Sequence, residues 1–171
     1  MTVGRFLGPP PATAGTLARA AAYVAATGWF GYAVQKVYMA AFGKIGMPGR
    51  VAPEHVQVQY DHPSLAQAGN AALGVFTAAV VLATVQRWAR WIPARVLLTV
   101  LAAASVPVVA GVVITLTRLP GSADGGAWWQ VLDGLLYGLQ VVAWLVVVAT
   151  YARRTRDARI ATASGCTEVA T

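Results

Sequence analysis

Apolar residues dominate four stretches of the chain, and polar segments separate them. The stretches cover about 20–42, 67–86, 96–117 and 128–151. A helix needs about 20 mostly apolar residues to cross the hydrocarbon core of a bilayer, so each stretch can cross it with some tilt. The first carries Lys36 late and ends without a small-x-small cleavage site, which favours a true span over a signal peptide. The pattern predicts an all-α fold, a four-helix transmembrane bundle over 20–151.

The remaining segments differ in character. Residues 1–19 contain consecutive prolines, which predict a disordered N-terminus. Residues 152–171 form a tail that is first basic and then small and polar. The loop 43–66 is too long for a simple turn, and residues 56–60 alternate as VQVQY, which predicts a short strand or an extended segment there.

Basic residues predict the orientation, because cytoplasmic loops carry an excess of Lys and Arg. The loops at 43–66 and 118–127 hold few basic residues, and acids lie beside them. Both termini and the turn between spans two and three are therefore predicted to be cytoplasmic. The arginines behind this prediction are Arg5, Arg19, Arg87, Arg90, Arg95, Arg153, Arg154, Arg156 and Arg159.

Composition agrees with a membrane protein. Hydrophobic residues make up 57% and charged residues 11%, against about 45–50% and about 25% in soluble domains. The net charge of +7 could suggest nucleic acid, but the basic residues cluster beside apolar runs, so we expect no nucleic-acid partner. The single cysteine, Cys166, excludes an internal disulfide and a cysteine-only metal cluster.

Small residues within the spans predict close helix packing. Gly134 and Gly138 form a GxxxG pair in span four, which we interpret as packing within the chain; a homo-oligomer through this pair is not favoured. Pro107 removes a backbone hydrogen bond from span three and predicts a bend there.

Polar side chains inside three spans follow helical spacing. In span four they are separated by three or four residues, which places them on one helical face. Spans one and two have comparable faces, and span three has none. The faces consist of Gly28, Tyr32, Gln35, Lys36 and Met39 in span one, of Gln67, Asn70, Gly74, Thr77 and Thr84 in span two, and of Gln130, Asp133, Tyr137, Gln140 and Trp144 in span four.

Some residues of these faces are expected to lie at similar depths in the membrane. At 1.5 Å of rise per residue, Lys36 lies about 9 Å, Asp133 about 8 Å and Asn70 about 5 Å below the outer ends of their spans. A charge facing lipid costs roughly 2.5 kcal/mol or more. We therefore predict that Lys36 pairs with Asp133, with hydrogen bonds from Gln35, Asn70, Tyr137 and Gln140.

Other interpretations of the two charges stay open. Lys36 could extend its long stem to the outer headgroups. Asp133 could lie at the interface behind Trp128 and Trp129, which resemble an aromatic belt. A pair that only holds the helices together is a third alternative.

The loop 43–66 holds both histidines, His55 and His62, each preceded by an acid. They could bind a divalent ion, but their spacing matches no known metal motif. We expect a solvated lid over the polar faces, and no cofactor. The chain also has no Walker loop, GxSxG, HExxH, CxxC or GxGxxG motif.

The stretch GWFGYAVQKVYMAAFGKIGMPG resembles small four-span membrane proteins of actinobacteria that carry no assigned function. The resemblance covers span one and the start of its loop. It implies a four-helix fold and a bacterial plasma membrane, and it transfers no catalytic residue.

Two classes of function follow. The first is a membrane enzyme or binder for a lipophilic molecule of isoprenoid type, because a carboxyl in a low-dielectric setting can stay protonated and act as an acid. Asp133 would be that acid beside Lys36, with Glu54 and Asp61 in reserve, and Tyr32, Tyr137 and Trp144 would line the pocket with Gln35, Asn70 and Gln140. The second is a non-catalytic component, an accessory subunit or small transporter, in which the polar pair is structural.

Overall fold

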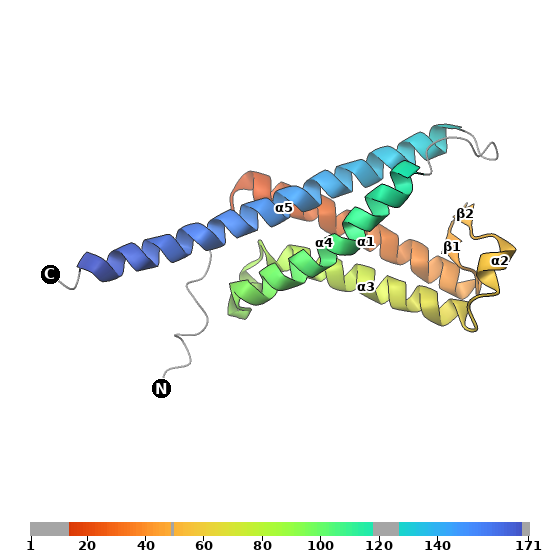
Figure 1. The fold of residues 1–171 in the computed structure, drawn as a ribbon, viewed down its shortest axis with the longest axis horizontal. Coiled ribbons are helices and arrows are strands. Elements are labelled where there is room, and N and C mark those ends of the chain that lie inside the picture. Colours follow the sequence, from red (N-terminus) through yellow and green to blue (C-terminus); the bar gives the residue numbers. More distant parts are fainter. Residues whose placement is uncertain (1–13, 49, 118–126, 169–171) are drawn as a thin grey trace. The chain divides into compact units, whose positions relative to one another are not determined.

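The computed structural model describes residues 14–48, 50–117 and 127–168 of the 171-residue chain. For residues 50, 112–117, 127–133, 162–163 and 165–168 it describes the backbone alone. Four long helices make up most of the described chain (Figure 1). They are α1 (Thr16–Ala41), α3 (Pro63–Ala83), α4 (Ala94–Thr117) and α5 (Ala127–Glu168).

Short elements occupy two of the connections. Between α1 and α3 lie β1 (Gly46–Met47), β2 (Arg50–Val51) and the single-turn helix α2 (Glu54–Gln57). The strands are antiparallel, with Gly46 opposite Val51 and Met47 opposite Arg50. The 3-10 helix η2 (Arg87–Trp91) connects α3 to α4.

Three helical segments are long and apolar enough to cross a membrane: Pro63–Ala83, Ala94–Gly111 and Gly134–Ala161. The prediction of a helical, multi-pass membrane protein is confirmed to this extent. Helix α1 has sufficient length, with 26 residues, but is not among the three. Arg19, Lys36 and several other polar residues lower its hydropathy.

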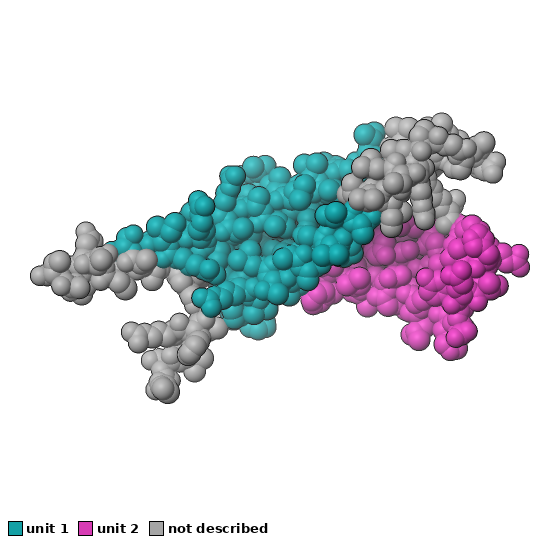
Figure 2. Space-filling model, in the orientation of Figure 1, with its two compact units in different colours: residues 1–25, 80–171 teal, residues 26–79 magenta. Residues whose placement is uncertain are grey.

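The chain divides into two compact units, one of Met1–Ala25 with Val80–Thr171 and the other of Ala26–Ala79 (Figure 2). In the first unit, α5 packs on α4 through two polar contacts. The indole Nε1 of Trp144 donates to Ser105 Oγ at 3.0 Å, and Tyr137 Oη donates to the Val108 carbonyl at 3.2 Å. A buried row continues along α5 through Val147, Tyr151 and Thr155.

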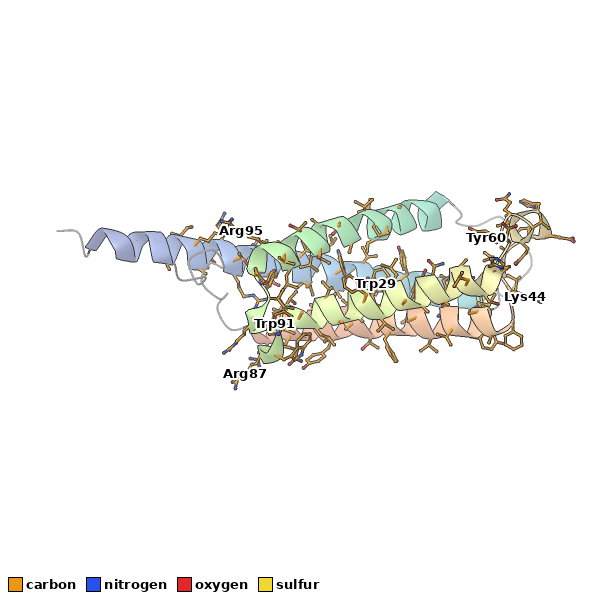
Figure 3. The ribbon with its side chains drawn as sticks, turned by 90° about the horizontal axis from the view of Figure 1, so that it is seen from below. Trp29, Lys44, Tyr60, Arg87, Trp91 and Arg95 are labelled. Carbon is orange, nitrogen blue, oxygen red and sulfur yellow. The ribbon has the colours of Figure 1, made fainter. Side chains whose placement is uncertain are left out.

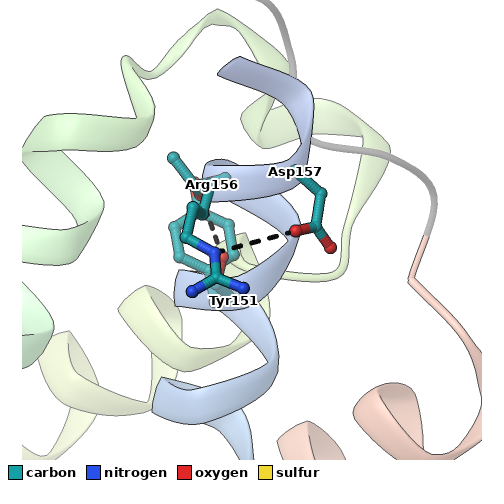
Figure 4. A network of polar contacts seen from close by, with 4 residues as sticks. Tyr151, Arg156 and Asp157 are labelled. Carbon is teal, nitrogen blue, oxygen red and sulfur yellow. Dashed lines mark hydrogen bonds and ion pairs between the residues drawn. The ribbon is translucent and has the colours of Figure 1, made fainter. Parts of the chain in front are cut away.

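Other polar contacts of this unit lie further along α5. Arg154 donates from Nη2 to the Thr84 carbonyl, just beyond the end of α3, at 3.2 Å. At the next residue, Thr155 Oγ1 donates to the Tyr151 carbonyl. Arg156 and Asp157 form an ion pair at 3.9 Å (Figure 4). Both partners of that pair are well exposed, so it contributes little to stability.

In the second unit, α1 and α3 approach closely at Gly74. A Cβ atom there would lie 3.1 Å from Ala33 Cβ, the Trp29 carbonyl oxygen and Tyr32 Cδ1. A side chain larger than glycine would therefore crowd this contact between α1 and α3. Gly134 and Gly138 differ, because a Cβ at either position would meet no atom within 4 Å. Our interpretation of that GxxxG pair as packing within the chain stays a prediction.

Several predicted boundaries need correction. Residues 56–60 form no strand: α2 begins after Pro53, whose carbonyl accepts from the amides of Val56 and Gln57, so a helical turn replaces the extended segment. Helix α1 begins at Thr16, inside the segment predicted as disordered, and residues 1–13 lie outside the described chain. The predicted tail is helical as far as Glu168.

Helix α4 continues through Pro107 from Ala94 to Thr117. Proline has no amide hydrogen, so the carbonyl of Ala103 receives no backbone donor from it. The bend predicted for this position stays a prediction.

Helix α5 exposes aliphatic side chains and turns polar groups toward its neighbour, the opposite of a helix on the surface of a water-soluble protein. Its exposed large side chains in the span are aliphatic: Leu135, Leu136, Leu139, Val142 and Leu145. The polar groups of Trp144 and Tyr137 are turned toward α4. A large exposed apolar surface of this kind is costly in water and normal in lipid.

Candidate functional site

The most unusual side chain in the described structure is Lys36 of α1. It is 7% exposed, although lysine is almost never fully buried unless paired. Its Nζ donates to the Gly46 carbonyl at 2.8 Å and lies 5.1 Å from the ring centroid of Tyr32. The ammonium is thus held by a main-chain dipole and an aromatic face.

A glycine cap at the end of α1 brings that carbonyl to Lys36. Gly43 has φ of +61°, its amide bonds to the Ala40 carbonyl at 3.1 Å, and the Lys44 amide bonds to the Met39 carbonyl at 3.1 Å. This pair of bonds is a Schellman motif, which ends a helix with a residue in the left-handed region. The chain reverses there, so residues 44–46 return over the end of α1.

Gln67 of α3 binds the same stretch of main chain. It is 1% exposed, and its Nε2 donates to the Lys44 carbonyl at 3.1 Å and to the Gly46 carbonyl at 3.3 Å. Its Oε1 is buried and receives no hydrogen bond from the described residues. Gly46 has φ of +131°, a conformation nearly restricted to glycine. Two buried side chains from different helices therefore converge on one carbonyl oxygen.

Gln57 of α2 closes the segment from its other side. Its Oε1 accepts from the Ile45 amide at 2.8 Å, and its Nε2 donates to the carbonyls of Ile45 at 2.9 Å and Ala52 at 3.0 Å. The Ala52 amide also bonds to the Ile45 carbonyl at 2.8 Å. We call residues 42–62 the connecting segment, and Lys36, Gln57 and Gln67 the lock, because all three side chains bond to its main chain.

The predicted polar faces are placed only in part as expected. Tyr32 contacts Lys36. Gln35 and Asn70 are exposed instead of contributing to the polar cluster. Helix α1 turns Ala33, Lys36 and Met39 inward, and Gln35 lies about 100° around the helix from Lys36. In α3, Gln67, Ala71 and Gly74 define the buried face, and Asn70 falls beside it.

The predicted residues of α5 belong to a different contact. Tyr137 and Trp144 bond to α4, as described above, and Gln140 is half-buried on the same side. These residues lie in the first unit, whereas the lock lies in the second. Tyr137 and Trp144 are therefore interhelical contacts of the α4–α5 pair.

The predicted acids contribute nothing to the described cluster. The side chain of Asp133 lies outside the side chains that the structure describes, so the Lys36–Asp133 pair stays a prediction. Glu54 and Asp61 are exposed in the connecting segment. Among the described residues, no group of three His, Cys, Asp or Glu side chains could hold a metal ion. This also applies to the residues around His55 and His62.

Sequence reasoning left Gln57 and Gln67 out of the candidate site. Gln67 belongs to the predicted polar face of span two, and its position one turn before the buried Ala71 and two turns before the buried Gly74 is the signal that separates it from Asn70. For Gln57 no local signal exists, because its partners are main-chain groups brought close by the Gly43 cap.

Comparison with known proteins found no matching family, no matching curated protein and no matching solved structure. The cluster offers spare donors on the Lys36 ammonium, which has three, and one acceptor on Gln67 Oε1. It can bind polar groups, and it contains no described carboxyl for proton transfer.

Proposed function

We propose that the chain is a four-span protein of a bacterial plasma membrane with both termini in the cytoplasm. Helix α1 would be the fourth span. Its Lys36 is buried while Phe30 is 59%, Val34 54% and Val37 59% exposed. This is the reverse of the order that water imposes. The distribution of arginines supports the orientation, and it would place the connecting segment outside the cell.

We infer further that the protein is a non-catalytic membrane component that presents the connecting segment to a partner. The observation behind this proposal is that the side chains of the lock form hydrogen bonds to main-chain groups of the connecting segment. Holding a loop in one conformation before binding reduces the entropy lost on association. Val58, at 74% exposed, Val51 and Tyr60 lie on the outside of the segment and would be the contact residues.

Gln57→Leu tests this proposal. The substitution removes three hydrogen bonds, each worth about 0.5–1.5 kcal/mol. We expect hydrogen exchange of residues 44–52 to accelerate at least about tenfold in the reconstituted protein. A photo-crosslinking residue at Val58 should form an adduct in native membranes, and Gln57→Leu should abolish it.

Gln59→Leu is the matched control, because Gln59 is exposed on the same segment. It should leave both exchange and crosslinking unchanged. Crosslinking that survives Gln57→Leu, or no adduct at Val58 in the wild-type protein, would contradict the presentation of this segment to a partner.

A second candidate function rests on Gln67 Oε1, a buried acceptor without a donor. A buried acceptor in that state costs about 1–3 kcal/mol. A lipophilic molecule with a hydroxyl could donate to Oε1 and accept from Lys36. This candidate retains the binder or enzyme of the sequence analysis with Asp133 as its acid, but without Gln35 and Asn70, which are exposed.

Native mass spectrometry tests the second candidate. If a lipophilic molecule binds there, it should copurify with the wild-type protein and be lost in Gln67→Leu. Asn70→Leu, a change of similar size on the exposed side of α3, should retain it. A bound molecule that persists equally in both variants would place it elsewhere.

A further inference from the structure

The turn between α3 and α4 carries a second, unrelated cluster, formed by arginine and tryptophan. Helix η2 has the sequence RWARW, and Arg95 follows in the first turn of α4. Trp88 is 55% and Trp91 75% exposed, whereas Ala89 is 3% exposed. Figure 3 shows Arg87, Trp91 and Arg95 around this junction.

The geometry of a 3-10 helix sorts these side chains into rows. Residues i and i+3 eclipse each other in such a helix. Trp88 and Trp91 therefore form one exposed row, Arg87 and Arg90 form the next, and Ala89 faces the protein. The exposed side of this turn therefore carries an aromatic row beside a cationic row. The packing of the turn on the protein uses Ala89 and does not require either row.

Among the side chains that the structure describes, the arginines of this turn have no acidic partner. Among the described side chains, the one ion pair joins Arg156 and Asp157 of α5, and no acid occurs between Asp61 and Asp124 in the sequence. Arg95 stands in the first turn of α4, where the helix dipole disfavours a cation. Within the described part of the chain, neither helix capping nor a salt bridge accounts for the three arginines.

We propose that η2 and Arg95 form a binding surface for the headgroups of anionic phospholipids. Tryptophan rings prefer the boundary between headgroups and acyl chains, so the row of Trp88 and Trp91 would enter that boundary. The adjacent guanidiniums then lie at phosphate level, where arginine forms bidentate hydrogen bonds. The turn joins two segments able to cross the membrane, α3 and the first part of α4, which holds it at that depth.

The test uses the purified full chain in dodecyl maltoside with added phosphatidylglycerol or phosphatidylcholine, and native mass spectrometry counts the lipids bound. Each arginine near an anionic surface contributes about fivefold in affinity. The double variant Arg87→Gln/Arg90→Gln should therefore weaken phosphatidylglycerol binding about 25-fold and leave phosphatidylcholine binding unchanged.

Arg156→Gln/Arg159→Gln is the control, because it removes the same charge from exposed positions of α5. It should keep the preference for phosphatidylglycerol. Equal losses in the two double variants would overturn the proposal, since net charge alone would then explain binding.

A second measurement uses the wild-type arginines, so its result does not depend on whether Arg87→Gln/Arg90→Gln folds. Brominated phosphatidylglycerol should quench the fluorescence of Trp88 and Trp91 more than brominated phosphatidylcholine does. The difference should vanish in Trp88→Phe/Trp91→Phe. Quenching that is the same for both lipids in the wild-type protein would also overturn the proposal.

Discussion

At the scale of single residues, the buried Lys36 depends on groups that no side-chain pattern shows. Its position on an inward face followed from helical spacing and from the cost of a charge in lipid. Its partner in the described structure is a carbonyl, that of Gly46, which a left-handed glycine at position 43 brings to it. Carbonyl positions depend on backbone geometry, so the sequence predicted the buried donor and not its acceptor.

Substitutions at Lys36 and Asp133 distinguish a structural lock from a charge pair. If the two residues pair, Lys36→Met and Asp133→Asn should each cost about 3–5 kcal/mol, because each leaves an uncompensated charge. The double substitution should then recover most of the folded yield, measured by size-exclusion chromatography of the detergent-solubilised protein.

If Lys36 bonds to the Gly46 carbonyl and does not pair with Asp133, the expected outcome differs. Lys36→Met should lower the yield through the lost bond to Gly46, worth about 1.5–3 kcal/mol for a charged donor. Asp133→Asn should have no effect, and the double variant should behave as Lys36→Met alone. Additive losses of similar size from both single substitutions would contradict both readings.

At the scale of helices, the apolar stretches predicted the three long segments that can cross a membrane and the general position of α1. The ends were less predictable. Hydropathy shows where the apolar residues end, whereas a helix ends where its backbone hydrogen bonds end. Helix α1 ends at a glycine cap, and α5 continues into polar residues. The strand expected at 56–60 failed because Pro53 initiates a helical turn.

Two glycines of α3 provide a test of the α1–α3 contact. Alanine at either position should gain up to about 1 kcal/mol from helix propensity. At Gly69 the new Cβ meets nothing within 4 Å, so Gly69→Ala should keep or raise Tm. At Gly74 the Cβ would lie 3.1 Å from three atoms, one of them a main-chain oxygen, and overpacking costs about 1–3 kcal/mol. Gly74→Ala should therefore lower Tm.

Thermal unfolding in detergent, followed by circular dichroism, measures both variants. Equal Tm values for Gly74→Ala and Gly69→Ala would show that α1 and α3 do not approach at Gly74 as described.

At the scale of the whole molecule, the inverted exposure of α1 and α5 and the placement of basic residues favour the same arrangement in the membrane. The proposed orientation makes opposite predictions for two positions. With Cys166 replaced by serine, a cysteine at the exposed Gln59 should react with a membrane-impermeant maleimide in intact cells. The native Cys166, in the wild-type chain, should react only after permeabilisation.

A matched control places the cysteine at Arg90, on the exposed turn between α3 and α4, where labelling should require permeabilisation as well. Reaction of Cys166 in intact cells would reverse the orientation and move the connecting segment to the cytoplasmic side.

The length of α5 has a mechanical consequence. It is one helix of 42 residues without proline, about 63 Å long, and the last residue of its buried row is Thr155. A tilt of about 10° with Ala127 as the pivot would displace Glu168 by about 10 Å. Cys166 stands near that end, so a probe on this native thiol would report small changes in the tilt of the span as larger displacements.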